Sequence, residues 1–234
     1  MGLHRADTPD GKQLTSIDIY WDLRNRLITS VFAPGLRLKP EDLRQEYNCA
    51  ASTIREVLLR LSADQLVELR DQRGFRTPVA SFTLLEELTE LRILVEAEGA
   101  RLSLKHGGLE WEANLSAAHH KLAHVENKMR AALDLNDFIQ VWCACEWQFH
   151  LALISACGSK TLINQYRDVY DRHRQQLMMV TQQFGYRREN ITEHRAILEA
   201  ALTHNQEDCI GLIGLHMRRG LAPELMRNAK WPTA

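Results

Sequence analysis

The sequence predicts a mainly α-helical protein, in which a small N-terminal unit with a β-hairpin precedes an all-α antiparallel helical bundle. Its 234 residues include only 6 prolines and 12 glycines, and helices are favoured because these residues are the main helix breakers. Apolar residues recur at helical spacing along most of the chain. Two short extended runs lie before residue 80, and only helical patterns follow them, so the fold is expected to change there.

The composition is that of an ordinary folded protein and excludes several classes. Apolar residues make up 45% and charged residues 25% of the chain, which is atypical of disordered or fibrous proteins. No apolar run approaches the ~20 residues of a membrane span, and the first residues are polar. We therefore expect a cytoplasmic protein without a membrane partner. The net charge of −1 provides no general attraction to nucleic acid, so DNA binding would depend on where individual arginines lie.

The first 80 residues contain the elements of one small domain. Residues 1–14 are polar and aperiodic and are expected to form a mobile arm, with a domain at 15–80. Helical spacing, a proline at a first helical position and strand-like runs around a turn define its elements. The predicted elements are helices over Ser16–Val31, Pro40–Tyr47 and Ser52–Leu61 (or from Ala51), and strands over Leu66–Arg70 and Phe75–Val79. The segment Asp71–Gly74 joins the strands, with glycine where a turn needs positive φ.

This order of elements is that of a winged helix-turn-helix, which places the second helix of the pair in the DNA major groove. Ser52 and Thr53 begin that helix, where hydroxyls and backbone N–H groups bind phosphates. Arg55, one turn further on, can donate to guanine O6 and N7 or to a phosphate. At the expected wing tip, Arg73 and Gly74 provide a cation and an unobstructed backbone. These five residues are therefore predicted to contact double-stranded DNA.

The same elements also occur in protein-binding modules. In that alternative, Arg55 forms a surface ion pair with Glu56 or Asp42. Spacing alone leaves both interpretations open, and the identity of the residues favours DNA.

Four short motifs occur together between residues 17 and 79. They are the Pro34-Gly35 turn, the stretch Arg55-Glu56-Val57-Leu58, the pair Leu66-Val67 and the pair Arg73-Gly74. In combination they resemble the N-terminal domain of the GntR family of bacterial transcription regulators. That family typically has a DNA-contacting arginine where this chain has Ala51, and a proline where it has Thr53. The resemblance implies a DNA-binding domain, and the two departures bear on which operator it binds.

After Ser81 the chain is expected to form one all-helical domain, 81–234. A leucine-rich stripe from Leu84 to Leu102 predicts a long helix that ends at Gly107-Gly108. Breaks at glycine and asparagine separate the elements that follow. Further helices are predicted over about 110–133, 137–156, 160–182, 189–203 and 206–227.

Three histidines and one glutamate of this helical half lie on faces that are otherwise apolar. Glu146 and His150 are four residues apart and so share one face of a helix, while His194 and His216 lie on the apolar stripes of two later helices. A carboxylate is rarely buried unless it is paired or binds a metal. Taken singly, each histidine is best explained as a satisfied core residue. Taken together, the four side chains match a first-row transition-metal site inside a bundle.

Three stretches of the helical half carry a second resemblance. They are CEWQFHLALISACGSKTL, EHRAILEAALTHNQEDC and GLHMRRGL, and they are similar to the FCD ligand-binding domain of the FadR branch of the GntR family. The resemblance implies a metal held by Glu146, His150, His194 and His216, with Glu146 in place of the usual aspartate. The stretch LTELRILVEAEGARLS is also similar to that domain and implies that Arg92 lines an effector pocket.

These features together predict a sequence-specific transcription regulator, expected to be a repressor and not an enzyme. The bundle would bind one divalent metal ion per chain, with zinc, nickel or manganese expected, and a small carboxylate effector held by Arg92. The resemblance implies a homodimer on a palindromic operator. One alternative is a metal-dependent hydrolase, since an open coordination position alone does not distinguish sensing from catalysis. Another is a direct metal sensor without an organic effector.

Overall fold

The computed structural model describes residues 14–132, 134–181 and 186–221. The chain divides into two compact units, Met1–Ala80 and Ser81–Ala234, and each is described by itself. The arm expected at 1–14 falls outside the described residues except for Leu14, and so does the part of the last predicted helix beyond residue 221. Within the described part of the chain, no helix is both long and apolar enough to cross a membrane.

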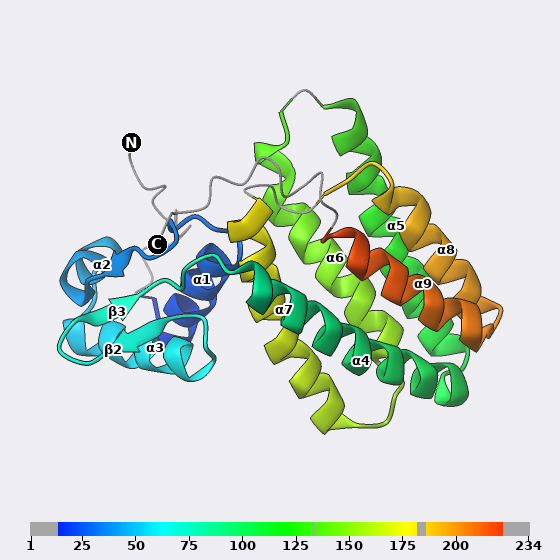
Figure 1. Cartoon of the computed structure of the whole chain (residues 1–234), viewed down its shortest axis with the longest axis horizontal. Helices are drawn as coiled ribbons and strands as arrows, with labels where there is room; N and C mark the ends of the chain where they lie inside the picture. Colours follow the sequence, from blue (N-terminus) through cyan, green and yellow to red (C-terminus); the bar gives the residue numbers. More distant parts are fainter. Residues whose placement is uncertain (1–13, 133, 182–185, 222–234) are drawn as a thin grey trace. The chain divides into compact units, whose positions relative to one another are not determined.

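In its described residues, 14–80, the N-terminal unit consists of three helices and a small antiparallel sheet (Figure 1). The elements are α1 (Ser16–Ile28), β1 (Arg37–Leu38), α2 (Pro40–Tyr47), α3 (Ala51–Ala63), β2 (Glu68–Arg70) and β3 (Gly74–Arg76). The strands lie in the order β1-β3-β2, with Leu38 and Leu69 both opposite Phe75. The predicted order of helices and hairpin is confirmed, and it is that of a winged helix-turn-helix.

Helix α1 ends three residues earlier than its apolar pattern predicts. Ser30 adopts a left-handed backbone with φ of 54°. Its N–H donates to the Leu27 carbonyl at 3.3 Å, and the N–H of Val31 donates to the Arg26 carbonyl at 3.0 Å. This pair of hydrogen bonds closes a helix end. The sequence carries no signal for it, because glycine rather than serine usually occupies that conformation.

The sheet also differs from the predicted strands. Strand β1 is only two residues long, too short to show an alternating pattern, and was not predicted. The strand predicted over Phe75–Val79 ends at Arg76, since Pro78 has no N–H to donate to a neighbouring strand. Strand β2 begins at Glu68 rather than Leu66, because the N–H groups of Leu66 and Val67 donate to the Leu61 carbonyl of α3, at 2.9 and 3.3 Å, and not to a neighbouring strand.

A core between α1 and α3 fixes the orientation of the second helix of the pair. Its buried apolar side chains recur at helical spacing, as an amphipathic helix requires. They include Ile19, Leu23 and Leu27 of α1 and Ile54, Val57, Leu58 and Leu61 of α3, with Phe75 of β3. Because these residues face inward, Ser52 and Arg55 on the other face of α3 are exposed.

In its described residues the C-terminal unit consists of six α-helices and a short 3-10 helix at Asn136–Phe138 (Figure 1). The α-helices are α4 (Phe82–His106), α5 (Leu109–Ala131), α6 (Ile139–Ile154), α7 (Lys160–Thr181), α8 (Asn190–Leu202) and α9 (Gln206–Arg219). Their bounds agree with the predicted helices to within a few residues, apart from those of α9, whose predicted end lies outside the described residues. Side chains cap three of these described helices: Ser81 accepts the N–H of Leu84 in α4, Ser159 that of Leu162 in α7, and Asn205 that of Asp208 in α9.

The interior of the bundle is unusual because it contains charged groups as well as apolar ones. Helix α4 packs on α7 and α9, α5 packs on α6 and α8, and α8 packs on α9. The apolar core is centred on α5 and α6, with Trp111, Leu115, Leu122, Trp142 and Phe149 among its members. Beside it, ionisable and polar side chains from α4 to α9 are buried. This buried polar region contains all four predicted metal ligands and Arg92.

Candidate functional site

Three histidines from three helices meet inside the bundle. His150 of α6 and His194 of α8 are 0% exposed, and His216 of α9 is 9% exposed. Their ligand nitrogens lie within 4.8 Å of one another, close enough to bind one ion. The ring centroids of His194 and His216 are 4.6 Å apart, and those of His150 and His216 are 5.5 Å apart. We call these three residues the histidine cluster.

Each member of the histidine cluster contacts a different glutamate through its Nδ1 atom. The Nδ1–Oε distances are 2.5 Å for His150 and Glu96, 3.0 Å for His194 and Glu126, and 2.6 Å for His216 and Glu193. An ionised carboxylate only accepts hydrogen bonds, so each Nδ1–H donates, and in a neutral imidazole this leaves the lone pair on Nε2. The Nε2 atoms of His150 and His194 are buried and have no hydrogen-bond partner. This is the arrangement in which carboxylates orient metal-binding imidazoles, so the residues fit a metal.

The electrostatics of His216 and Glu193 agree with that protonation. Burial, together with the nearby His194 and His150, lowers the pKa of His216 to about 3, even though the hydrogen bond to Glu193 raises it. Burial would raise the pKa of Glu193, but hydrogen bonds from His216 and Arg219 lower it to about 2. His216 is therefore neutral at pH 7, as a metal-ligating imidazole must be.

Glu146, the fourth predicted ligand, lies beside the histidine cluster and faces other partners. Its Oε1 is 3.5 Å from Nε2 of His150 and 3.3 Å from Nη2 of Arg92. Its Oε2 accepts a hydrogen bond from the hydroxyl of Tyr170 and lies 3.9 Å from Nη1 of Arg174. Burial would raise the pKa of Glu146, but the charges of Arg174 and Arg92 hold it well below its ordinary value. The structure thus brings three of the four predicted ligands together, whereas the fourth, Glu146, forms ion pairs with arginines.

Arg92 is buried, at 1% exposure, and belongs to the same polar region. Its Nε donates to Glu96 at 3.4 Å, its Nη1 donates to Nδ1 of His173 at 3.2 Å, and its guanidinium lies over the ring of Tyr170. A cavity of about 30 Å³ is lined by Arg92, Glu146, His173, Arg174, His216 and several neighbours. Arg92 therefore lines a cavity beside the histidines, and its role in binding an effector stays a prediction.

Sequence reasoning missed several residues of this region. Tyr170 and Arg174 are four apart on one face of α7, and a search for polar residues at helical spacing would have found them. Glu96 follows Arg92 by four residues on α4, and Glu193 directly precedes His194. Glu126 of α5 carries no such signal, because only the fold brings it to His194.

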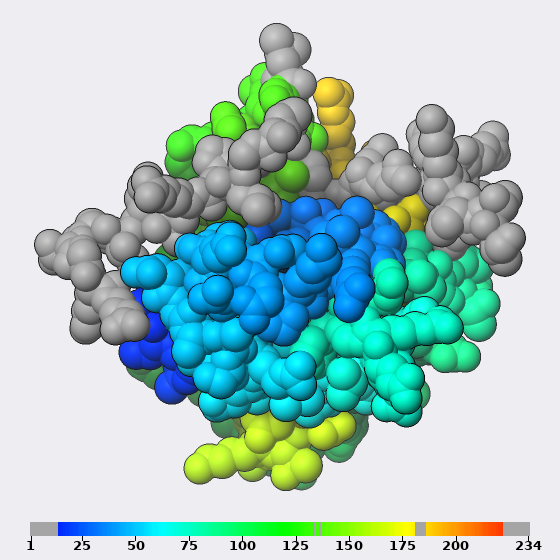
Figure 2. Space-filling model, turned by 90° about the vertical axis from the view of Figure 1, so that its left-hand side faces the viewer, coloured from blue at the N-terminus to red at the C-terminus, as the bar shows by residue number. Residues whose placement is uncertain are grey.

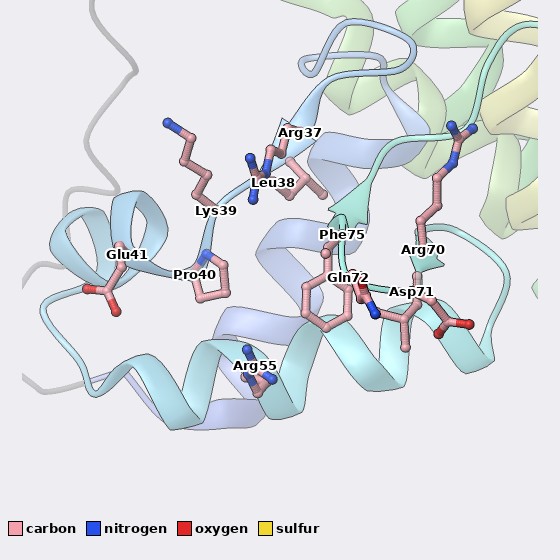
Figure 3. Close-up of a pocket in the computed structure, with 12 residues that line it drawn as sticks. Arg37, Leu38, Lys39, Pro40, Glu41, Arg55, Arg70, Asp71, Gln72 and Phe75 are labelled. Carbon is pink, nitrogen blue, oxygen red and sulfur yellow. The ribbon is translucent and has the colours of Figure 1, made fainter.

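The N-terminal unit has an open groove of about 520 Å³ between α3, the α2 entry and the wing. In Figure 3, Arg55 projects from α3 on one side of the groove, with Arg37 and Lys39 on another and Gln72 of the wing turn on a third. Arg70 of β2 also lines it. Cations therefore lie on two facing sides of a surface that is open to solvent, and the carboxylates Glu41 and Asp71 also line it. Figure 2 shows the N-terminal unit in space filling, with its blue to teal residues turned toward the viewer.

The five predicted DNA contacts have different places around this groove. Arg55 and Gly74 line it, whereas Ser52, Thr53 and Arg73 do not. The wing turn has the predicted backbone, because Gly74 has φ of 72°. Within the described residues no ion pair joins Arg55 to Glu56 or Asp42, and Asp42 instead lies 3.9 Å from Nζ of Lys39. Arg55 therefore lacks the surface pairing expected of the protein-binding alternative.

Comparison with known proteins assigns both units. The family model described as "Bacterial regulatory proteins, gntR family" matches residues 15–76, and the "FCD domain" model matches residues 87–219. A regulator named BphR from Paraburkholderia xenovorans (strain LB400) is 30% identical over 201 residues, which cover 86% of this chain and 81% of that protein. The transcriptional repressor GlaR of Escherichia coli (strain K12) is 30% identical over 158 residues, 68% of this chain and 70% of that protein.

The fold is also found among solved structures. That of McbR/YncC from E. coli matches with a TM-score of 0.75 at 20% identity, over 91% of this chain and 97% of that one. A regulator from Rhodococcus sp. RHA1 matches with a TM-score of 0.72 at 21% identity, over 92% and 99%. At these identities the likeness establishes the fold of the chain.

Proposed function

Because this chain belongs to the GntR family of transcription regulators, with a FadR-like FCD domain, we propose that its bundle binds a divalent metal and an organic acid that modulate DNA affinity. DNA-binding regulation follows from the family, and so does the absence of an enzymatic role. The metal-dependent hydrolase considered from the sequence is therefore set aside.

The single observation that carries the metal proposal is the orientation of the histidine cluster. Three buried imidazoles each donate Nδ1–H to their own glutamate, and two of the Nε2 atoms are buried without a partner. A buried polar atom without a partner is costly, and a metal ion removes that cost. His150, His194 and His216 would hold the ion, with Glu146 as the predicted fourth ligand. Imidazole suits zinc and nickel, and a carboxylate adds manganese to the expected metals.

An acid effector is supported by the cations around the cavity. Arg92 and Arg174 are both buried and both line it. Buried guanidinium groups form strong, charge-assisted hydrogen bonds with carboxylates. A bound metal would supply a further positive charge and an open coordination position at the same place. A small anionic metabolite therefore suits this site better than a neutral ligand does.

For DNA we propose that a homodimer binds a palindromic operator, each copy placing α3 in a major groove. Arg55 would contact a base or a phosphate, Ser52 and Thr53 the backbone at the start of α3, and Arg73 with Gly74 the minor groove. Repression is proposed because a relative that is 30% identical is named a repressor. Such a regulator acts in the cytoplasm, where the operator is.

A DNA-binding titration of the full chain, with and without metal and candidate acids, tests this function. The operator fragment would be selected in vitro from random DNA. We expect at least one small carboxylate to change operator affinity by about 5- to 150-fold in the metal-loaded protein, the usual range of coupling between sites. The change should vanish when the metal is removed.

The small volume of the cavity favours a second candidate function, a direct metal sensor. A space of about 30 Å³ holds about two water molecules rather than an organic acid. In that case the metal alone would change operator affinity, and no acid would change it further. If neither metal nor acid altered DNA binding, both candidates would be refuted.

A further inference from the structure

Glu146 has the surroundings that a carboxylate ligand of this protein would need. Within the described residues, the group of potential metal ligands that lie close together contains only the three imidazoles of the histidine cluster. The Glu146 carboxylate instead lies 3.3 Å from Arg92 and 3.9 Å from Arg174, and it accepts the Tyr170 hydroxyl. Two guanidinium groups and one hydroxyl donor form a complete receptor for a carboxylate.

In the structure, this receptor is already occupied by the Glu146 carboxylate. Arg92 is 1% and Arg174 is 2% exposed, and Arg174 also lies over the ring of Trp142 and donates to Sγ of Cys143 at 2.9 Å. The cavity that these residues line has a volume of about 30 Å³, so an acid cannot reach the two arginines unless a side chain moves. The Glu146 carboxylate is the group that already occupies the place between them.

The same carboxylate also lies next to the metal site. Its Oε1 is 3.5 Å from Nε2 of His150 and 3.3 Å from Nη2 of Arg92. It therefore stands between two sets of partners, the arginines on one side and the histidine cluster on the other. A glutamate carries its carboxylate one methylene further from the backbone than an aspartate does. This extra length and rotatable bond allow the carboxylate to turn between the arginines and the histidine cluster.

We propose that Glu146 is the resident anion of the acid subsite: it pairs with Arg92 and Arg174 in the metal-free chain and vacates the place between them for the effector's carboxylate when it turns to a bound metal. This inference rests on the proposed function, because it assigns how metal and acid affect each other there. The metal withdraws the carboxylate that competes with the acid. Metal and acid therefore bind with positive coupling, and each raises the affinity for the other by the same factor.

Acid binding to the metal-free full chain tests the assignment. Equilibrium dialysis with radiolabelled acetate and succinate would compare the wild type with Glu146→Gln, which removes the charge, and Glu146→Ala, which also adds space. We expect at least one acid to bind a variant at least about tenfold more tightly than it binds the metal-free wild type. Glu146→Asp keeps the charge on a shorter side chain and should give an intermediate affinity, so it remains informative if the other two variants fail to fold.

Glu90→Gln is the matched control. Glu90 accepts two hydrogen bonds from Arg218 at 2.8 and 2.7 Å on the surface, so this variant also frees an arginine but outside the cavity. It should bind acid as the wild type does. The assignment is overturned if the metal-free wild type binds acid as tightly as the Glu146 variants, or if none of these variants exceeds Glu90→Gln. The proposed function fails separately if the metal-loaded wild type binds no acid and its operator affinity responds to none.

Discussion

The groove of the N-terminal unit and the polar region of the bundle both gather charged side chains, but the groove is open to solvent whereas most side chains of the polar region are buried. Arg55 is exposed and has no ion-pair partner among the residues described here. Arg92, by contrast, contacts Glu96, Glu146 and His173 at 1% exposure. Charges in water interact weakly and are screened by salt, whereas charges in a protein interior interact strongly and require partners. A substitution in the groove is therefore expected to affect one contact at a time. A substitution in the buried region is expected to affect several residues, because their charges interact with one another.

The largest effect is expected where the buried region loses a metal-facing imidazole. His194→Ala removes an Nε2 that faces the other two members of the histidine cluster, so metal affinity should fall by more than about a hundredfold. DNA binding by the metal-free chain should remain, because the helix-turn-helix has its own core. Competition against a chelator measures the first effect and operator titration the second. His124→Ala, an exposed histidine of α5, is the control; loss of DNA binding in His194→Ala would make the cluster structural.

Removing an orienting carboxylate should have the next largest effect. Glu126→Gln replaces the charged acceptor of the Nδ1–H of His194 by a neutral amide oxygen, which holds the ring less strongly and makes it a weaker ligand. Metal affinity should fall by about 10- to 100-fold, the usual cost of losing such a partner. Glu112 is a matched control, because it lies 3.2 Å from Nε2 of the exposed His204. Equal losses in Glu126→Gln and Glu112→Gln would show that the buried glutamate does not orient a ligand.

On the groove, Arg55→Ala should weaken operator binding by ~1–3 kcal/mol without changing the stability of the fold. The side chain is exposed and lines the groove, so its loss removes a DNA contact and no packing. Fluorescence anisotropy over a range of salt concentrations would measure it, with a shallower salt slope if Arg55 binds a phosphate. Arg101→Ala removes the same charge from the C-terminal unit and should change neither quantity. If the Arg55→Ala protein bound the operator as tightly as the wild type does, the proposal that α3 lies in the major groove would be contradicted.

The smallest effect is expected for the pH dependence of stability and involves His173, a buried histidine that is not a predicted metal ligand. Burial and the neighbouring Arg92 hold the pKa of His173 well below 6.5. The unfolded chain takes up a proton below about pH 6.5 and the folded chain does not, so the free energy of unfolding falls as the pH drops through that range. The slope is at most about 1.4 kcal/mol per pH unit for one proton. Urea unfolding at pH 7 and 5.5 should show a smaller decrease for His173→Gln; an unchanged decrease would assign it to other groups.

The two regions also differ in how far the sequence predicts them. Arg55 and the Asp71–Gly74 turn were predicted because a local pattern determines a helix face and a positive φ. Arg37 and Lys39 were missed, since they reach the groove only through the two-residue strand β1 and the start of α2. In the bundle, spacing and a resemblance to the FCD domain placed His150, His194 and His216 together.

The partners of these histidines could not be predicted in the same way. Glu126 comes from a different helix, 68 residues before His194, and no local pattern links the two. The direction of the Glu146 carboxylate depends on Tyr170 and Arg174 of α7, which only tertiary packing brings to it. Helix spacing thus identifies which side chains face inward, whereas their pairing follows from how the helices pack.

X-ray absorption spectroscopy at the metal edge of the zinc- or nickel-loaded full chain shows whether the histidine cluster binds a metal. We expect one ion per chain by elemental analysis, with imidazole nitrogens at about 2.0–2.1 Å for zinc and no sulfur ligand. The imidazole signal should be lost in His216→Ala. Failure to retain metal after loading, or a spectrum with sulfur ligands that is unchanged in His216→Ala, would contradict metal binding by the histidine cluster.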